Sequence, residues 1–284
     1  MKKKRSKKHI GLYLVLIVMA AATLFPILYT VTNSFMGAQE IAEYYEGLSA
    51  EVSTGSPLHL IPRRATLSGY TALLLERPHY LMKFWTSLGL CAVIVLGQIV
   101  IAVLGGYAFA KFRFPGYNGI FFFLIALMMM PYQVMLVPSY MVMDQLGLVG
   151  SYTALILPAV FSAFGVFLMR QVFAAIPDSL LESARIDSAG NWRILWQVVL
   201  PNCKSGLFSL LVLCFIDTWN MVEQPLVFLR ESYQYPLAVF LLEVNKTDPA
   251  LGFACGLLSM LPVLVLFLFF DEEMISGIGY SIIK

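Results

Sequence analysis

The sequence predicts an all-α integral membrane protein with six transmembrane helices and cytoplasmic N- and C-termini. Its 284 residues are 59% hydrophobic and 13% charged, whereas a soluble domain is about half apolar and about a quarter charged. Six apolar stretches can be matched to the roughly 20 residues that a helix needs to cross a bilayer. Six of the 19 Lys and Arg residues precede Ile10, which predicts a cytoplasmic N-terminus.

The first apolar run extends from Ile10 to Thr32, and no charge follows it before Glu40. It is therefore too long for the apolar core of a cleaved secretory signal. We expect a basic cytoplasmic N-terminus at 1–9 and a first transmembrane helix at 10–32. The mixed segment 33–83 is expected to be an extracytoplasmic loop, 84–271 the remaining transmembrane core, and 272–284 a C-terminal tail.

The second run, Phe84 to Ala110, carries a ridge of small residues near its end, at Ala102, Gly106 and Ala110. Small residues four apart let another helix approach closely, so this ridge predicts a helix–helix interface. Lys111 and Arg113 follow in a short turn and place positive charge on the predicted cytoplasmic side.

The third run starts near Tyr117, extends to about Val134 and contains Pro131, which predicts a broken helix. A fourth run, Ser151 to Met169, is expected to stop at Arg170. The fifth begins near Gly206 and is interrupted by charged and polar residues. Pro249 to Phe270 forms the sixth, and the acidic cluster after it weighs little in the orientation rule.

A polar segment between the fourth and fifth runs predicts two short helices outside the membrane, on the cytoplasmic side by parity. Ser179 and Glu182 match a capping box, so a first helix is expected from Ser179 to Asp187. A turn is expected at 188–190, and a second helix is expected to end near Leu200, before Pro201.

The second of these helices carries an apolar stripe with helical spacing, which is able to bury against another surface. The stripe consists of Trp192, Leu195, Trp196 and Val199. Periodicity alone fits equally well an amphipathic pair that rests on lipid headgroups.

This segment resembles the cytoplasmic "EAA" loop of ATP-binding-cassette (ABC) importer permeases. Residues 182–189 read Glu-Ser-Ala-Arg-Ile-Asp-Ser-Ala, followed by Trp192 and then Leu200-Pro201. The chain departs from the family pattern at Ser183, where Ala is usual, and at Ser188, where Gly is usual, and it has a glycine at Gly190 instead.

Further motifs resemble the carbohydrate-uptake branch of these permeases, related to the inner permeases of maltose-type systems. They lie between about Thr66 and Phe270 and include the Phe114-Pro-Gly116 turn, Met130-Pro131, Ile176-Pro177 and Trp219-Asn220. The resemblance implies a multi-pass permease of the bacterial cell membrane that forms half of a sugar pathway.

The resemblance also implies partners: a homologous second permease, a pair of ATPase subunits, an extracytoplasmic solute-binding protein, lipid and a sugar substrate. The helix pair would couple to the ATPase through Glu182, Ala184, Asp187, Ala189, Gly190, Trp192, Leu200 and Pro201. Glu182 and Asp187 would be its charged contacts. ATP and Mg would bind the ATPase, because this chain has no phosphate-binding G-x-x-x-x-G-K-[ST] loop.

Other chemistry has little support in the sequence. The four cysteines show no metal-ligand spacing and the three histidines lie outside the apolar runs, so no metal site and no catalytic site are predicted. The net charge of +2 does not suggest a nucleic-acid partner.

Ionisable groups within a membrane usually face a cavity or a partner. A possible substrate pathway therefore consists of Tyr132, Gln133, Asp217, Trp219, Asn220, Glu223 and Gln224. Alternatively, Asp217 and Glu223 lie near the outer boundary or pair across the subunit interface, and the partner permease holds most substrate contacts.

Three other functions remain open from the sequence. An importer of amino acids or polyamines would carry a similar loop. An ion-coupled secondary transporter would need broken helices in two related halves, and no such symmetry is visible. A membrane enzyme would need clustered His, Asp or Glu, and only Asp217 and Glu223 are candidates.

Overall fold

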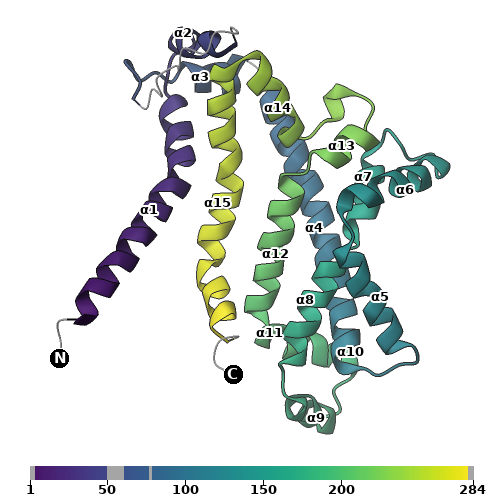
Figure 1. Cartoon of the computed structure of the whole chain (residues 1–284). Coiled ribbons are helices and arrows are strands. Elements are labelled where there is room, and N and C mark those ends of the chain that lie inside the picture. Colours follow the sequence, from purple (N-terminus) through teal and green to yellow (C-terminus); the bar gives the residue numbers. More distant parts are fainter. Residues whose placement is uncertain (1–3, 50–60, 77–78, 281–284) are drawn as a thin grey trace. The chain divides into compact units, whose positions relative to one another are not determined.

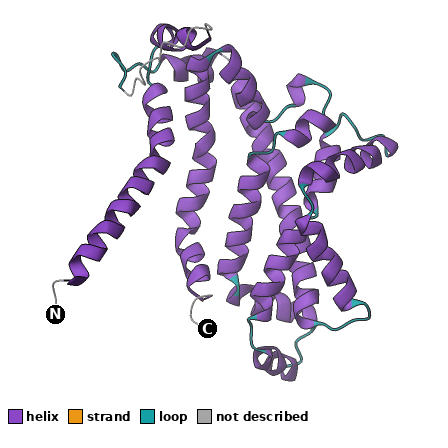
Figure 2. Ribbon diagram, viewed as in Figure 1, coloured by secondary structure: helices purple, strands orange, loops and turns teal. Residues whose placement is uncertain are grey.

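A computed structural model describes residues 4–49, 61–76 and 79–280 of the chain. All regular elements in these ranges are helical, and no strand occurs among them (Figures 1 and 2). The prediction of an all-helical protein is therefore confirmed. The chain divides into two compact units, residues 1–82 with 240–261 and residues 83–239 with 262–284.

The first unit contains the long helix α1 (Lys4–Asn33) and three shorter elements. These are α2 (Ala38–Ser49), α3 (Ser68–Thr71) and the π-helical turn η1 (Ala72–Glu76). Side chains 11–28 of α1 are exposed, which suits an apolar helix surrounded by lipid. At the end of α1, Met36 and Ile41 pack with Ala250, and the Tyr70 hydroxyl donates to Ser34 Oγ at 2.6 Å.

The second unit contains most of α4 and the elements that follow it. Their bounds are α4 (His79–Lys111), α5 (Tyr117–Met129), α6 (Tyr132–Gln145), α7 (Tyr152–Val160), α8 (Ala163–Ala174), α9 (Asp178–Ile186), α10 (Asn191–Ile194), the π turn η2 (Leu195–Val199), α11 (Leu200–Asn202), α12 (Lys204–Trp219), α13 (Glu223–Phe228) and η3 (Ser232–Gln234). Both units draw on the last two helices, α14 (Leu237–Thr247) and α15 (Pro249–Tyr280).

Close packing of α4 against α8 organises the second unit. Ala102 is fully buried and lies against Gly165, where an added Cβ would be 3.1 Å from the Ala102 methyl carbon. One turn later Gly106 meets the backbone of Met169 and Arg170 directly. Ala102 and Gly106 of the small-residue ridge on α4 therefore pack against α8. Ala110, the third member of the ridge, is half-buried.

The helix that contains Pro131 is broken, as the sequence predicts. Met130 is extended, with ψ 128°, and the two halves, α5 and α6, meet at a bend of 107°. The helix ends at Met129 because Pro131 disfavours the helical conformation of the residue before it. The sharp bend directs Tyr132 and Gln133 towards α13.

One expected helix end is wrong. The fourth apolar run does not stop at Arg170, because α8 continues to Ala174. Arg170 donates from Nε and Nη2 to the Tyr117 hydroxyl oxygen, both at 3.2 Å, and its Cζ lies 4.3 Å from the Phe121 ring centroid. These contacts hold the charge within the helix, so the charge does not end it.

Four stretches within the described part of the chain are long and apolar enough to cross a membrane: Gly11–Asn33, His79–Lys111, Tyr152–Ala174 and Pro249–Asp271. Two bent pairs, α5 with α6 and the 191–202 helix with α12, raise the number to six if each pair is one span. The structure therefore supports four to six spans.

Candidate functional site

The helix pair between α8 and α12 lies at one end of the second unit, and α6 and α13 lie at the other (Figure 1). Its first helix, α9, begins at Asp178 after Pro177, and no side chain caps its N-terminus. The expected capping box of Ser179 and Glu182 is therefore wrong. Ser179 lies inside the helix, because the contacts of Asp178 start the helix one residue earlier.

An ammonium group at the end of α4 fixes the start of α9. Lys111 Nζ donates to the Ile176 carbonyl oxygen at 2.7 Å and to Asp178 Oδ1 at 2.8 Å. The Lys111 side chain is 5% exposed, whereas that of Asp178 is 78% exposed. The hydrogen bond from Lys111, followed by its charge, lowers the pKa of Asp178 below the usual value. This contact joins the helix pair to α4.

The lowered pKa of Asp178 predicts the pH range over which this contact stabilises α9. A depressed carboxyl pKa contributes stability above the unfolded-state value of 3.8, and this contribution is lost as the pH falls through the lower folded-state value. We therefore expect amide protection of α9, corrected for intrinsic exchange, to be constant from pH 8 to 5 and to fall below pH 3.8. Asp178→Asn should lack this step, and an identical step in Asp178→Asn would contradict the assignment.

A left-handed residue ends α9. Ser188 has φ 58°, its N–H donates to the Arg185 carbonyl, and the Ala189 N–H donates to the Ala184 carbonyl. This pair of bonds is a Schellman motif, in which the left-handed position favours glycine. Gly190 does not supply the missing glycine, because its φ is −70° and it precedes α10.

The left-handed Ser188 predicts a stabilising substitution. Ser188→Gly removes the clash of a Cβ in the left-handed region and should stabilise the end of α9 by about 1 kcal/mol. Amide exchange of residues 178–189 would then slow about fivefold. As a matched control, Ser183→Gly inside α9 should speed the same exchange, because glycine weakens a helix interior. Faster exchange in Ser188→Gly would contradict the assigned turn.

The second helix is longer than expected, and its backbone hydrogen bonds change locally to the π-helical pattern. It runs through α10, η2 and α11 to Asn202, beyond Pro201, where the sequence predicts an end before the proline. The Leu200 N–H reaches the Leu195 carbonyl, five residues back. This wider turn comes just before Pro201, which has no N–H to donate, so the helix continues past it.

The predicted apolar stripe of this helix is divided between two faces. Leu195 and Val199 are 1% and 0% exposed, but Trp192 and Trp196 are 66% and 61% exposed. The aliphatic residues of the stripe already pack within the chain, so only its two tryptophans remain available to another surface. Two indole rings are left at the surface.

Most residues proposed for coupling are exposed. Glu182, Asp187, Gly190, Trp192 and Pro201 are at the surface, Ala184 and Ala189 are half-buried, and Leu200 is buried. Sequence reasoning missed the apolar residues on the same surface: Ile186 is 84% exposed and Leu180 is 43% exposed. The position of an isoleucine between two charged residues, Arg185 and Asp187, is the sequence signal that could have revealed this exposed apolar group. Together with Trp192 and Trp196, these side chains give the helix pair four large exposed apolar groups.

Polar side chains from two points where a helix is interrupted line a cavity of about 520 Å³ near the other end of the unit. Six of the seven predicted pathway residues line it: Tyr132, Gln133, Asp217, Asn220, Glu223 and Gln224. Gln133 Nε2 donates to the two Glu223 carboxylate oxygens at 3.3 and 3.2 Å. The break at Pro131 and the break after Trp219 thus present their polar residues to one space.

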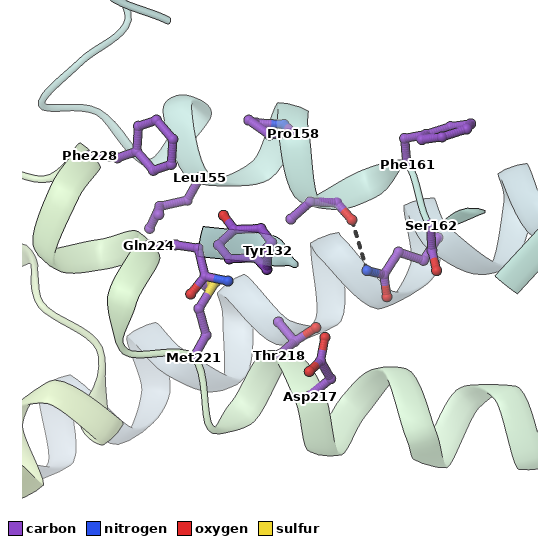
Figure 3. A pocket seen from close by; sticks show the side chains of 12 residues that line it. Tyr132, Leu155, Pro158, Phe161, Ser162, Asp217, Thr218, Met221, Gln224 and Phe228 are labelled. Carbon is purple, nitrogen blue, oxygen red and sulfur yellow. Dashed lines mark hydrogen bonds between the residues drawn. The ribbon is translucent and has the colours of Figure 1, made fainter. Parts of the chain in front are cut away.

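A smaller cavity of about 180 Å³ shares Tyr132, Asp217, Met221 and Gln224 with the first. Figure 3 shows Asp217 and Thr218 on one wall of it and Pro158 on the opposite wall. It reaches Gln98 of α4, which lies 13 residues before Lys111, or about 20 Å along the helix.

Trp219 is not among the residues that line these cavities. It is 6% exposed and stacks on Phe215, with ring centroids 5.5 Å apart, and its edge meets Phe84. The structure thus packs this indole in the α4–α12 interface, apart from the other six residues predicted for the pathway.

No group of three His, Cys, Asp or Glu side chains suited to a metal ion occurs among the described residues. The four cysteine thiols are free and buried.

Comparison with known proteins identifies the family. The family "Binding-protein-dependent transport system inner membrane component" matches residues 98–272, more than half of the chain. The arabinooligosaccharides transport system permease protein AraQ of Bacillus subtilis (strain 168) is 28% identical over 97% of this chain and 96% of the relative. The sn-glycerol-3-phosphate transport system permease protein UgpE of Rhizobium meliloti (strain 1021) is 31% identical over 86% and 85%.

A solved structure has a similar fold. One chain of a bacterial ABC transporter involved in the import of the acidic polysaccharide alginate matches with a TM-score of 0.80 and 23% identity, over 96% of this chain and 99% of that one. Together with the family match, this agrees with the family resemblance seen at residues 182–189 and in the Phe114-Pro-Gly116 turn. The chain belongs to the family of binding-protein-dependent transport system inner membrane components.

Proposed function

We propose that this chain is one permease subunit of an ATP-driven ABC importer and forms half of the pathway for a sugar or oligosaccharide. An external solute-binding protein delivers the substrate. The observation that carries the proposal is the exposed helix pair α9–α11, which Lys111 joins to α4, in a member of a binding-protein-dependent transport family. The relative AraQ, named for arabinooligosaccharides, supports a carbohydrate substrate.

The proposed topology has six spans, with each bent pair counted as one. The basic segment 1–9 and the C-terminal tail 272–284 are cytoplasmic, span one is 10–32, the segment 33–83 is extracytoplasmic, and the permease core is 84–271. Lys111, Arg113 and the α9–α11 pair then share the cytoplasmic side, in agreement with the positive-inside rule. The opposite sidedness would put this positive charge outside.

In this proposal α9–α11 docks into a groove on an ATPase subunit. Glu182 and Asp187 supply charge, and Ile186, Trp192 and Trp196 supply apolar contacts on the same exposed element. ATP and Mg bind the ATPase, and closure of the ATPase pair moves the helix pair as a rigid body. Because Lys111 binds the start of α9, this movement is transmitted to α4. Gln98, which lines the smaller cavity, lies about 20 Å further along α4.

The substrate pathway of this subunit is the pair of cavities at the breaks after Met129 and Trp219. A homologous second permease supplies the other wall. Polar groups on broken helices suit this role, because a non-helical backbone at membrane depth is tolerated where it lines a cavity. The residues proposed are Tyr132, Gln133, Asp217, Asn220, Glu223 and Gln224.

ATP-driven uptake is the test of this function. The complete importer in proteoliposomes, with its binding protein outside, should accumulate labelled arabinotriose or maltotriose only when ATP is inside. Uptake that follows an ion gradient and ignores ATP would contradict the proposal and favour a secondary transporter.

A further inference from the structure

The charge of the two cavities is of one sign. Asp217 and Glu223 both line the larger cavity, and no Lys, Arg or His is among the residues that line either cavity. Asp217 is exposed, and the described part of the chain offers it no salt bridge. An anionic solute in this space would meet like charges without a compensating cation, and such a juxtaposition is costly.

Several amide donors that line the cavities are already engaged by protein acceptors. Gln98 Nε2 donates to the Ala159 carbonyl at 2.8 Å, which is the dashed line in Figure 3. Gln133 donates to Glu223, and Asn220 Nδ2 donates to the Ile216 carbonyl at 2.8 Å. Three amide nitrogens are thus directed to protein oxygens, while the carboxylates offer only acceptors.

A buried acceptor without a partner points to a missing donor. Gln98 is 8% exposed, lines the smaller cavity together with Asp217, and its Oε1 accepts no hydrogen bond within the described residues. Leaving such a group unsatisfied costs free energy, so a hydroxyl or amine donor in the cavity would relieve that cost.

We infer that this subunit's wall of the pathway selects by charge: it accepts saccharides that are rich in donors and carry no negative charge, and it excludes uronates and sugar phosphates. This deepens the proposed function and rests on it. The inference separates this chain from relatives named for sn-glycerol 3-phosphate and for the acidic polysaccharide alginate, despite the shared fold.

The local potential can be measured without a known substrate. Val222 lines the larger cavity beside Glu223, so a Val222→Cys thiol in the assembled transporter, in its native membrane, can be modified by two methanethiosulfonates. One reagent carries a trimethylammonium group and the other a sulfonate. The four native cysteines are buried, and the unmodified chain measures their background reaction.

We expect the cationic reagent to react roughly tenfold faster at Val222→Cys than the anionic one, relative to their ratio on a free thiol, because a charged cleft concentrates counter-ions. Adding Asp217→Asn and Glu223→Gln should bring this preference to within about twofold of the free-thiol ratio. Leu146→Cys, at a position 60% exposed on the end of α6 and outside both cavities, is the control and should show no preference.

Several results would overturn the inference. These are equal rates for the two reagents at Val222→Cys, a preference that survives the double substitution, or no reaction at all. The assay needs neither ATP nor transport, so it can fail while ATP-driven uptake succeeds, and the reverse. In uptake, arabinotriose should then exceed a uronate trisaccharide by roughly tenfold.

Discussion

The Gly106→Ala variant is expected to lose about 2–3 kcal/mol of unfolding free energy, because overpacking a tight interface costs about this much. An added Cβ at Gly106 would lie 2.6 Å from Met169 Cβ and 2.9 Å from the Arg170 backbone nitrogen. Backbone atoms cannot move aside as the end of a side chain can, so α4 and α8 must separate. Thermal unfolding of the purified protein in detergent, followed by Trp fluorescence, measures the loss.

The same helix provides a matched control. Gly89 of α4 is exposed, and an added Cβ there meets nothing within 4 Å. Gly89→Ala should therefore be neutral or gain up to about 1 kcal/mol, because alanine is the better helix former. Equal effects of the two substitutions would contradict the assigned α4–α8 packing.

The second large effect is expected at the apolar surface of α9. Ile186→Ser should weaken binding of the proposed ATPase partner about 30-fold, or about 2 kcal/mol, the typical value for an apolar anchor buried in an interface. Because Ile186 is 84% exposed in this chain, its replacement should leave folding unchanged. Titration of the ATPase against immobilised permease in nanodiscs measures the change.

Leu146→Ser provides the comparison for this prediction. Leu146 is also exposed, at 60%, but it lies at the end of α6, far along the chain from the helix pair. The Leu146→Ser variant should bind the ATPase with the same affinity as the unaltered chain. An Ile186→Ser variant with unchanged affinity would mean that α9 does not form the apolar part of the contact.

Sequence patterns predict those parts of the fold that local chemistry decides. Pro131 breaks its helix because it lacks an N–H and restricts Met130, and both effects act on neighbouring residues. The small side chains of Ala102 and Gly106 likewise predict a close helix–helix contact, because small residues allow two backbones to approach. The partner helix, α8, could not be predicted from that pattern.

Tertiary contacts decide the features that the sequence predicts wrongly. The match to a capping box at Ser179 is overridden because Lys111, 67 residues earlier, binds Asp178. Trp219 is suited to sugar binding by its residue type, but in the structure Phe84 and Phe215 already pack on it. Periodicity unites Trp192 with Leu195, yet the π turn and the rest of the chain bury only the aliphatic side.

The candidate cavity illustrates both cases. The pattern of polar residues in an apolar run correctly selects Asp217, Asn220 and Glu223 as residues that share a space. Gln98 is not found in this way, because a single glutamine in an apolar helix has no local signal of its role. Only the structure brings Gln98 beside Asp217.

Purification of the tagged chain from its native membrane in mild detergent, with mass spectrometry of what accompanies it, tests the central claim most directly. Wild type is compared with Glu182→Ala, which changes the exposed face of α9, and with Asp144→Asn, an exposed acidic residue of α6. We predict that an ATPase and a second permease accompany the wild type and Asp144→Asn, and that the ATPase is lost or weakened in Glu182→Ala. A chain that purifies alone, or an ATPase equally retained by Glu182→Ala, would contradict the account.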